Sequence, residues 1–475
     1  MPTLAVRVEP GKPGRTVPPS FPGLSIEHPD LPDYAGSGGA PNLAFVRLMQ
    51  LLGSFGNGSP TLRIGGHSTD QSWWNPAGAP LPAGVITNIT PAWIDGLAGA
   101  AAQAHTPVVL GLNLGIGNVA NALEFAQVAL GRLPAEAIRS FEIGNEPDLY
   151  TKPRTFHVGR RVLKRERHRA SYDFDSYTQD LDPYIASLYP LGTPLAAGGF
   201  AGRDWTSRTR ELLVRGGRRV RELSVHSYGL QTCGRARQRP ASKLIRRLLS
   251  TRRSIKRIAK LGSIARKQGV ALRVSETNTA VCGGVGRVSN SFASALWGAD
   301  SLFGYMKAGA VGVNMHTWTG AWYAPLEFRY IEGKRVTFVR PLFYGMLLFA
   351  KATANQGQLL RSHWHGHSRV RIWATRGADG KLRVMALNVN DHISRELRIR
   401  IPGVEGRAIV ERLTAPSLGA RHGVRLGGRS FGRSSVSGRI RGRLAKTHVP
   451  HVRGTYRLRL PAASGALLTI SARQR

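Results

Sequence analysis

Two glutamates stand directly after apolar runs that are typical of buried strands. Glu146 follows such a run in SFEIGNEP, and Glu276 follows another in ALRVSETN. Cleavage of a glycosidic bond needs two carboxyl groups, one protonated to serve the leaving oxygen and one ionised to attack the anomeric carbon. A single glutamate at such a position more often caps a helix or pairs with an arginine. Two in matched contexts instead predict a glycoside hydrolase.

The elements that must position these glutamates alternate between short apolar runs and helical stretches. The runs have the composition of parallel strands that are buried on both faces. They are GLSIEH (23–28), TLRIGGH (61–67), PVVLGLNLG (107–115), SFEIGNEP (140–147), PLAAGGF (194–200), ELSVHSYG (222–229), ALRVSETN (271–278) and VGVNMHTW (311–318). Eight alternations predict a closed (β/α)8 barrel, in which catalytic groups lie at the carboxyl ends of the strands. Both glutamates are then expected at the same rim.

The remaining strand ends carry the side chains of a sugar-binding site. Carboxylates, imidazoles and amides bind sugar hydroxyls, and aromatic rings offer surfaces for stacking. The polar candidates are Glu27, His28, His67, Asp70, Asn113, Asn145, His226, Tyr228 and His316, and the aromatic ones are Trp73, Trp74, Trp318, Trp322 and Tyr323. Taken alone, His226 and His316 would more often be satisfied core or rim histidines. We expect no metal and no cofactor, since sugar hydrolysis by two carboxylates needs neither.

A second region begins near Phe349, where apolar and polar residues alternate strictly. The segment RVRIWATRGADGKLRVMALNVN is typical, and Asp379-Gly380 supplies a hairpin turn within it. This pattern predicts an antiparallel β-sandwich, to which the alternating LAVRVEP (4–10) is expected to add an edge strand. The expected fold class is therefore α/β, with a (β/α)8 TIM barrel over 21–348 and a β-sandwich domain over 349–475, joined by a strand from 1–20.

The charge of the chain is strongly positive. It has 67 Lys and Arg against 28 Asp and Glu, which gives a formal net charge of +39. Such a charge attracts polyanions at low salt, but no nucleic-acid recognition motif and no basic stripe with interleaved aromatics is present. We expect a preference for an acidic substrate and no dedicated nucleic-acid partner. A general bias toward arginine explains the composition equally well.

The cysteines and the N-terminus bear on the compartment. Cys233 lies just beyond the sixth expected strand and Cys282 just beyond the seventh, so a disulfide between two neighbouring loops is geometrically feasible, although the sequence leaves their bonding open. The first twenty residues lack the features of a secretory signal, and no apolar run is long enough to span a membrane. We expect a secreted or cell-surface protein, with a cytoplasmic location as the alternative.

Several segments resemble glycoside hydrolase family 79, the β-glucuronidase and heparanase-like family. They are FEIGNEPDLY, VSETNTAVCGG, LSIEHPDLPDYAG, TLRIGGHSTDQSWW, HSYG and GVNMHTW, which together span most of residues 20–350. The resemblance implies a clan A barrel and a double-displacement mechanism that retains the β configuration. It also implies that Glu146 is the general acid/base and Glu276 the nucleophile.

The resemblance also implies roles for the surrounding residues. Asn145 would hold the sugar 2-hydroxyl, and His226 or Tyr228 would orient the nucleophile. Further substrate contacts would come from Glu27, His67, Asp70 and His316. In members that act on glucuronides, the substrate carboxylate is expected to meet aromatic hydroxyls and backbone amides, and Tyr323 and Gly283 are suitably placed for this. Val281 departs from the pattern, because a tyrosine is expected there.

The preferred hypothesis is therefore a retaining β-glucuronidase-like hydrolase, whose carboxyl groups should lie roughly 5–5.5 Å apart. A separation near 8 Å would instead indicate an inverting mechanism. A β-glycosidase acting on a neutral glucoside or galactoside is the nearest alternative, with Val281 in its favour. A non-catalytic carbohydrate- or polyanion-binding protein is the alternative from another class, and the intact glutamate pair argues against it.

Overall fold

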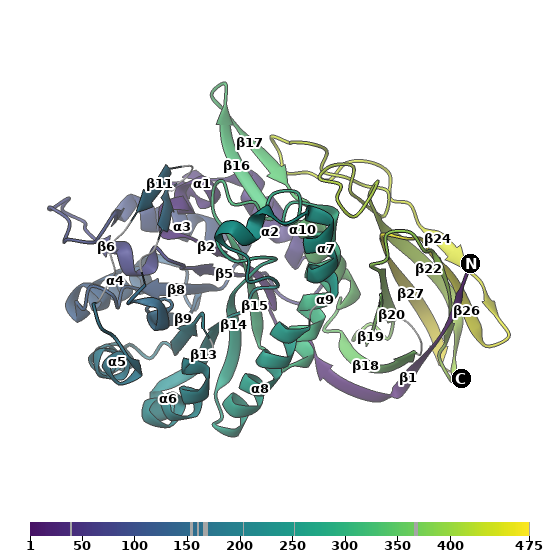
Figure 1. Cartoon of the computed structure of the whole chain (residues 1–475), viewed down its shortest axis with the longest axis horizontal. Helices are drawn as coiled ribbons and strands as arrows, with labels where there is room; N and C mark the ends of the chain where they lie inside the picture. The colour runs from purple at the N-terminus through teal and green to yellow at the C-terminus, as the bar shows by residue number, and fades with distance from the viewer. Residues whose placement is uncertain are drawn as a thin grey trace.

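The computed structural model describes residues 1–38, 40–152, 155–158, 161–164, 170–202, 204–250, 252–364 and 369–474. Its larger part is a closed barrel of parallel strands in the order β12-β13-β14-β15-β2-β5-β8-β9 (Figure 1). The strands are β2 Pro22–Ile26, β5 Thr61–Ile64, β8 Val108–Leu112, β9 Ile138–Ile143, β12 Leu195–Phe200, β13 Val220–His226, β14 Ala271–Thr277 and β15 Gly312–Thr317. The predicted TIM barrel is confirmed, and each of the eight expected runs overlaps one of its strands.

Helices cover the barrel because parallel strands must be buried on both faces. They are α1 Leu31–Ala35, α2 Leu43–Gly53, α3 Pro91–Ala104, α4 Val119–Arg132, α5 Phe174–Leu188, α6 Thr209–Gly216, α7 Ala241–Ser250, α8 Arg253–Lys267, α9 Phe292–Lys307 and α10 Pro341–Ala352. Side chains of Asn42, Thr90, Asn118 and Asp173 accept hydrogen bonds from the first turns of α2 to α5. These caps satisfy amides that would otherwise lack partners.

Short strands lie in the loops that connect the elements of the barrel. They are β3 Gly36–Ser37, β4 Ala40–Pro41, β6 Ser72–Trp74, β7 Thr87–Ile89, β10 Thr155–Val158, β11 Arg161–Lys164, β16 Leu326–Ile331 and β17 Lys334–Val339. The hairpin of β16 and β17 projects beyond the barrel in Figure 1 and was not expected from the sequence. Among the described residues, no helix combines the length and apolar character needed to cross a membrane.

The second region is an antiparallel β-sandwich, as expected. Its sheet runs in the order β23-β22-β27-β20-β19-β18-β1-β21-β26-β25, with β24 also pairing β22. The strands are β1 Thr3–Thr16, β18 Gln358–Trp364, β19 Val370–Arg376, β20 Leu382–Asn388, β21 Arg395–Arg400, β22 Val404–Thr414, β23 Arg425–Leu426, β24 Thr447–Val449, β25 His451–Val452, β26 Thr455–Leu460 and β27 Ser464–Gln474. It encloses an apolar core separate from that of the barrel.

The N-terminal strand β1 is not the edge strand expected from its alternating sequence. It pairs with β18 on one side, in antiparallel orientation, and with β21 on the other, in parallel orientation. Leu4, Val6 and Val8 point into the core of the sandwich. The expectation of an edge position was wrong because alternation shows that one face is buried, and it does not show how many neighbours a strand has.

Helices α9 and α10 lie between the barrel and the sandwich in Figure 1. Asp300 of α9 accepts a hydrogen bond of 2.8 Å from the Trp373 indole and lies 3.3 Å from Nε of Arg371. Lys351 of α10 lies 2.9 Å from Glu411 of β22. These contacts join charged groups across an otherwise apolar boundary, so they favour one orientation of the sandwich against the barrel.

Candidate active site

The two predicted glutamates meet at the carboxyl end of the barrel. Glu146 follows β9 with a left-handed backbone (φ 49°, ψ 52°), and Pro147 opens a short helix directly behind it. Glu276 lies near the end of β14, and its neighbour across the ladder is His226 of β13. Both side chains are almost fully buried. One oxygen from each carboxylate and a ring nitrogen of His226 all lie within 4.8 Å of one another.

Positively charged and donor groups surround Glu276. Tyr228 donates a hydrogen bond of 2.6 Å to Oε1, and Nη1 of Arg63 donates one of 3.0 Å to Oε2. Nδ1 of His316 lies 3.7 Å from Oε2. Burial raises the pKa of Glu276, but the charges of His316, His226 and Arg63 lower it by a larger amount. The resulting pKa is about 2. Glu276 is therefore ionised at any ordinary pH.

Glu146 is bonded by two imidazoles. His226 Nδ1 lies 3.0 Å from Oε1, and His67 Nε2 lies 3.2 Å from Oε2. Burial raises the pKa of Glu146, and the hydrogen bonds from His226 and His67 lower it by more, so that it falls well below its ordinary value. The two carboxylates thus have different partners, since tyrosine and arginine bond Glu276 whereas histidines bond Glu146.

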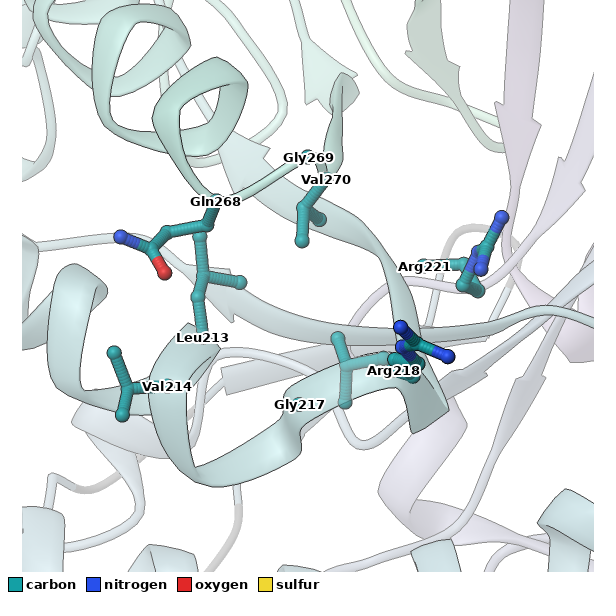
Figure 2. A pocket seen from close by; sticks show the side chains of 9 residues that line it. Leu213, Val214, Gly217, Arg218, Arg221, Gln268, Gly269 and Val270 are labelled. Carbon is teal, nitrogen blue, oxygen red and sulfur yellow. The ribbon is translucent and has the colours of Figure 1, made fainter.

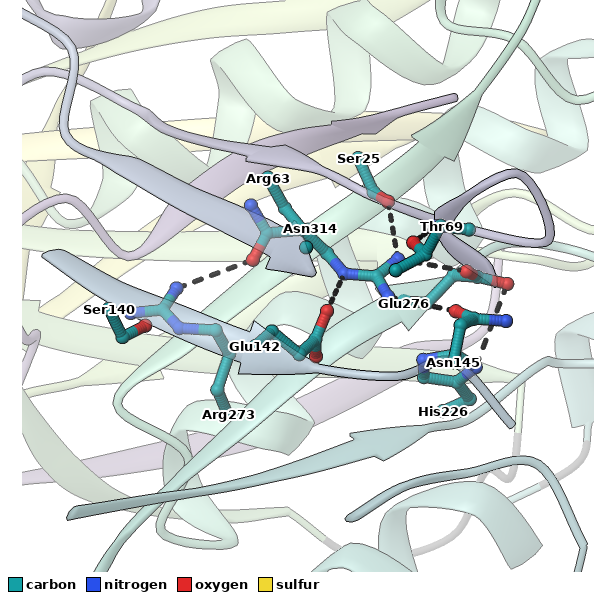
Figure 3. Close-up of polar contacts among 12 residues, drawn as sticks. Ser25, Arg63, Thr69, Ser140, Glu142, Asn145, His226, Arg273, Glu276 and Asn314 are labelled. Carbon is teal, nitrogen blue, oxygen red and sulfur yellow. Dashed lines mark hydrogen bonds and ion pairs between the residues drawn. The ribbon is translucent and has the colours of Figure 1, made fainter. Parts of the chain in front are cut away.

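Arg63 organises the centre of the site and was missed in the sequence. Its guanidinium, fully buried on β5, donates to Glu142, to Ser25 Oγ at 2.9 Å, to Asn145 Oδ1 at 2.9 Å and to Glu276 (Figure 3). The signal that could have revealed it is a charged residue in the middle of an apolar strand, because such a residue needs a buried partner.

Asp70 forms its hydrogen bonds within the protein. Oδ1 accepts the backbone amides of Leu114 and Gly115 at 2.9 and 3.0 Å, and Oδ2 accepts the Asn145 amide at 3.0 Å and the Tyr150 hydroxyl at 2.8 Å. The side chain is fully buried. Four hydrogen bonds occupy the acceptor positions of a carboxylate. The expectation that Asp70 grips sugar hydroxyls is corrected to a supporting role beneath Asn145.

Glu27 is likewise bonded within the protein. It accepts the backbone amides of His67 and Ser68 at 3.1 and 2.9 Å and the Ser68 hydroxyl, and it lies 3.2 Å from Nε2 of His316. The Glu27 side chain is buried, and its bonds hold the loop after β5. His316 in turn lies 3.2 Å from Ser25 Oγ. These bonds connect the strand ends beneath the site.

Two buried polar atoms at the site have no hydrogen-bond partner among the described residues. They are Nδ2 of Asn145 and Nε2 of His226. Buried polar atoms are nearly always bonded, so an unpaired amide donor beside the carboxylates indicates a place for a bound hydroxyl or water. Asn145 is oriented for this by Arg63 on its carbonyl oxygen.

Aromatic residues form one wall of the site. Tyr323 packs with Tyr228 at 6.2 Å between ring centroids, and its hydroxyl accepts a hydrogen bond of 3.1 Å from the Trp318 indole. Gly283 has φ +77°, and a Cβ added there would lie 2.7 Å from the Trp318 ring. The wall therefore requires glycine at this position. Trp322, which is 47% exposed, donates its backbone amide to Gly283 O at 2.8 Å.

A disulfide joins the loops after β13 and β14, which carry Tyr228 and Gly283 of this wall. The structure bonds Cys233 to Cys282, with 5.9 Å between the Cα atoms. The bridge connects the segment after Tyr228 to the residue directly before Gly283. Val281, where a tyrosine was expected, is half-buried and donates its amide to Leu230 O at 3.1 Å.

A groove of about 330 Å3 lies elsewhere, at the amino ends of β13 and β14. Leu213, Val220 and Val270 line it, and Arg218 and Arg221 stand at its rim (Figure 2). Catalytic groups of this fold occupy the opposite end of the barrel. Arg218 follows the C-terminal end of α6, where the helix dipole favours a positive charge. The groove is therefore separate from the candidate active site.

Comparisons with known proteins show which proteins the chain is similar to. No family model matches the chain. It is 26% identical over 310 residues to a β-glucuronidase of Aspergillus niger, covering 59% of this chain and 55% of that protein. A Neurospora crassa β-glucuronidase is 26% identical over 164 residues, covering 31% and 29%. The chain is thus similar to β-glucuronidases. It spans about half the length of the first of these relatives and less of the second.

Solved structures share the fold over the whole chain. A 4-O-α-L-rhamnosyl-β-D-glucuronidase of Fusarium oxysporum has a TM-score of 0.77 at 19% identity, covering 98% of this chain and 100% of that one. An arabinofuranosidase of glycoside hydrolase family 51 from Xanthomonas axonopodis has a TM-score of 0.70 at 17% identity, covering 99% and 100%. At identities this low, the structural similarity shows a common fold alone.

Proposed function

We propose that the protein is a retaining β-glycoside hydrolase of the β-glucuronidase type, with Glu276 as nucleophile and Glu146 as general acid/base. The observation that carries the proposal is the pair of buried carboxylates whose nearest oxygens lie within 4.8 Å. Retaining enzymes need roughly 5–5.5 Å between the carboxyl groups, and inverting enzymes need more space for a water molecule. Arg63 and Tyr228 keep Glu276 ionised for attack.

The reaction then has two balanced steps. In the first, a Glu276 oxygen bonds to the anomeric carbon, the bond to the leaving oxygen breaks, and that oxygen takes the proton of Glu146. In the second, water attacks the anomeric carbon and gives a proton to Glu146, while the ester to Glu276 breaks. Asn145, through its unpaired Nδ2, would bind a sugar hydroxyl that gains hydrogen-bond strength in the transition state.

A glucuronide is the proposed substrate. Both curated relatives are named β-glucuronidase, and the Fusarium structure is named as acting on a glucuronide. The Tyr323 hydroxyl and the backbone of the Gly283 loop offer neutral hydrogen-bond groups for the sugar carboxylate, close to the candidate nucleophile. The positive charge of the chain also attracts an acidic substrate. Val281 favours a neutral glycoside as the second candidate, because it removes one expected hydroxyl donor.

A secreted or cell-surface location is part of the proposal. The Cys233–Cys282 bridge supports it, since disulfides persist mainly outside the reducing cytosol. The partner is a carbohydrate substrate, and the site residues require no cofactor for the two steps above.

The test is hydrolysis of p-nitrophenyl β-glucuronide beside the β-glucoside and the β-galactoside, by the parent protein and by Glu276→Ala. We expect activity on the glucuronide that Glu276→Ala abolishes and that Glu332→Ala, an exposed hairpin glutamate, leaves intact. Proton NMR of the first-formed sugar should show the β anomer. A first-formed α anomer would contradict retention, and activity on neutral substrates alone would transfer the proposal to the second candidate.

A further inference from the structure

His67 contacts the proposed acid and is partly exposed to solvent. Its Nε2 lies 3.2 Å from Oε2 of Glu146, and its side chain is 33% exposed whereas that of Glu146 is 7% exposed. His226 bonds the other carboxylate oxygen at 3.0 Å. The role expected for His67 was a contact to sugar hydroxyls, but the ring nitrogen is directed at Glu146.

The loop that carries His67 is held firmly. The His67 amide donates to Glu27 at 3.1 Å, and the Gly66 amide donates to Thr69 Oγ1 at 3.1 Å. Gly66 has φ +129°, and a side chain at that position would collide with the Glu27 carboxylate. The backbone from which the His67 side chain reaches Glu146 is therefore fixed in place.

We propose that His67 is a positioning residue which, by donating a hydrogen bond to Glu146, stabilises its ionised form and sets the pH above which activity is lost. This inference rests on the proposed function of Glu146 as general acid. Donation to a carboxylate favours the charged form over the protonated form. The general acid must be protonated when substrate binds, so activity falls as the pH rises past the pKa of Glu146.

Other charged and titratable groups also act on this pair. Glu146 faces His226 of β13, Glu276 of β14 and Asp148 of the following short helix, and His67 lies near Glu27 of the β2 loop. The negative charges of Glu276 and Asp148 oppose ionisation of Glu146, whereas the imidazoles favour it. A substitution of His67 leaves the contacts of Glu276 in place. A substitution of His226 would not, because Nδ1 of His226 also lies 3.8 Å from the Glu276 carboxylate.

The test compares His67→Phe, which removes the donor, with His67→Gln, which retains a neutral donor of similar reach. His363→Gln, an exposed histidine of the sandwich, is the matched control. The titration of the Glu146 carboxyl is followed by carbon-13 NMR, with the resonance assigned by its loss in Glu146→Gln. The alkaline limb of the pH profile of kcat/KM is measured on the same proteins with the active glycoside.

We expect His67→Phe to raise both the carboxyl titration and the alkaline limb by about one pH unit, a tenfold change in acid dissociation. His67→Gln should fall between this variant and the parent, and His363→Gln should match the parent. An unmoved carboxyl titration, or an active His67→Phe enzyme with an unmoved alkaline limb, would overturn the role of His67. A parent protein that hydrolyses no glycoside would instead overturn the proposed function, while the carboxyl titration would still decide the effect of the hydrogen bond.

Discussion

Two arginines are buried inside the same barrel, one toward each end. Arg63 lies at the carboxyl end, and its guanidinium contacts Glu142, Glu276 and Asn145. Arg273 lies nearer the amino end, where it donates to Glu222 at 2.9 Å. It also donates to Asn314 at 3.3 Å (Figure 3). Arg273 also leaves Nη2 without a hydrogen-bond partner among the described residues.

The two arginines differ in whether their carboxylate partners include a proposed catalytic residue. Each arginine is desolvated and needs a carboxylate partner, so each pair constrains the packing of neighbouring strands. Only the pair at the carboxyl end has a second carboxylate within its reach, and that carboxylate is the proposed nucleophile. The same buried residue type thus serves stability at one end and, we propose, chemistry at the other.

The sharpest way to break this comparison is a matched pair of glutamate variants. Glu276→Gln should lower kcat on the active glycoside by on the order of 10⁴-fold or more, because the nucleophile is lost. Glu222→Gln, which changes the partner of Arg273, should lower kcat by less than about tenfold. Steady-state kinetics on both proteins measures this. Equal losses in both variants would show that the two ends are not distinct in function.

The arginines themselves give the next largest effect. Arg63→Met should lower kcat/KM by about 100-fold, since Glu276 and Asn145 lose the group that orients them. Arg273→Met should leave kcat/KM within about tenfold of the parent. Both variants should lose about 3–5 kcal/mol of unfolding free energy, measured by denaturant titration, because each removes from a buried carboxylate the cation that lies nearest to it. A catalytic loss in Arg273→Met of the size found in Arg63→Met would remove the distinction.

The ionisation of Glu276 at the carboxyl end should make the stability of the protein depend on pH. The folded-state pKa of Glu276 is about 2 against an ordinary value of 4.5, so its contribution is present above pH 4.5 and is lost as the pH falls toward 2. The contribution amounts to about 3 kcal/mol. Denaturant unfolding at pH 6 and pH 3 should therefore show a smaller loss of stability in Glu276→Gln than in the parent. An identical pH slope in the two proteins would contradict the low pKa.

Asp70 should give a smaller effect than Glu276 or Arg63, although it also lies under the carboxyl end. Asp70→Asn replaces an oxygen that accepts the Asn145 amide or the Tyr150 hydroxyl by a donor, which disturbs Asn145 from below. We expect kcat to fall about tenfold, with a loss of about 1–3 kcal/mol in unfolding free energy. KM should change little. A large rise in KM with unchanged kcat would restore the role of Asp70 as a direct sugar contact.

Sequence reasoning predicted the barrel and its strand ends because buried parallel strands produce apolar runs that turns interrupt. Glu146 and Glu276 could be found since both terminate such runs. Arg63 could not be assigned a partner, because strand alternation does not state which buried residues of other strands face it. Asp70 was misassigned for a related reason: sequence spacing puts it near the rim, and only the fold shows four internal donors around its carboxylate.

The position of β1 has a consequence for the order in which the chain can fold during synthesis. The first strand sits between β18 and β21, whose residues are made more than three hundred positions later. The barrel can therefore close before β1 has any partner strand. The sandwich can be completed only after β21 has been synthesised. Contacts of such long sequence separation form slowly. Until then the apolar side chains of Leu4, Val6 and Val8 lack the sandwich core that covers them in the folded protein, and exposed apolar surface of this kind favours aggregation.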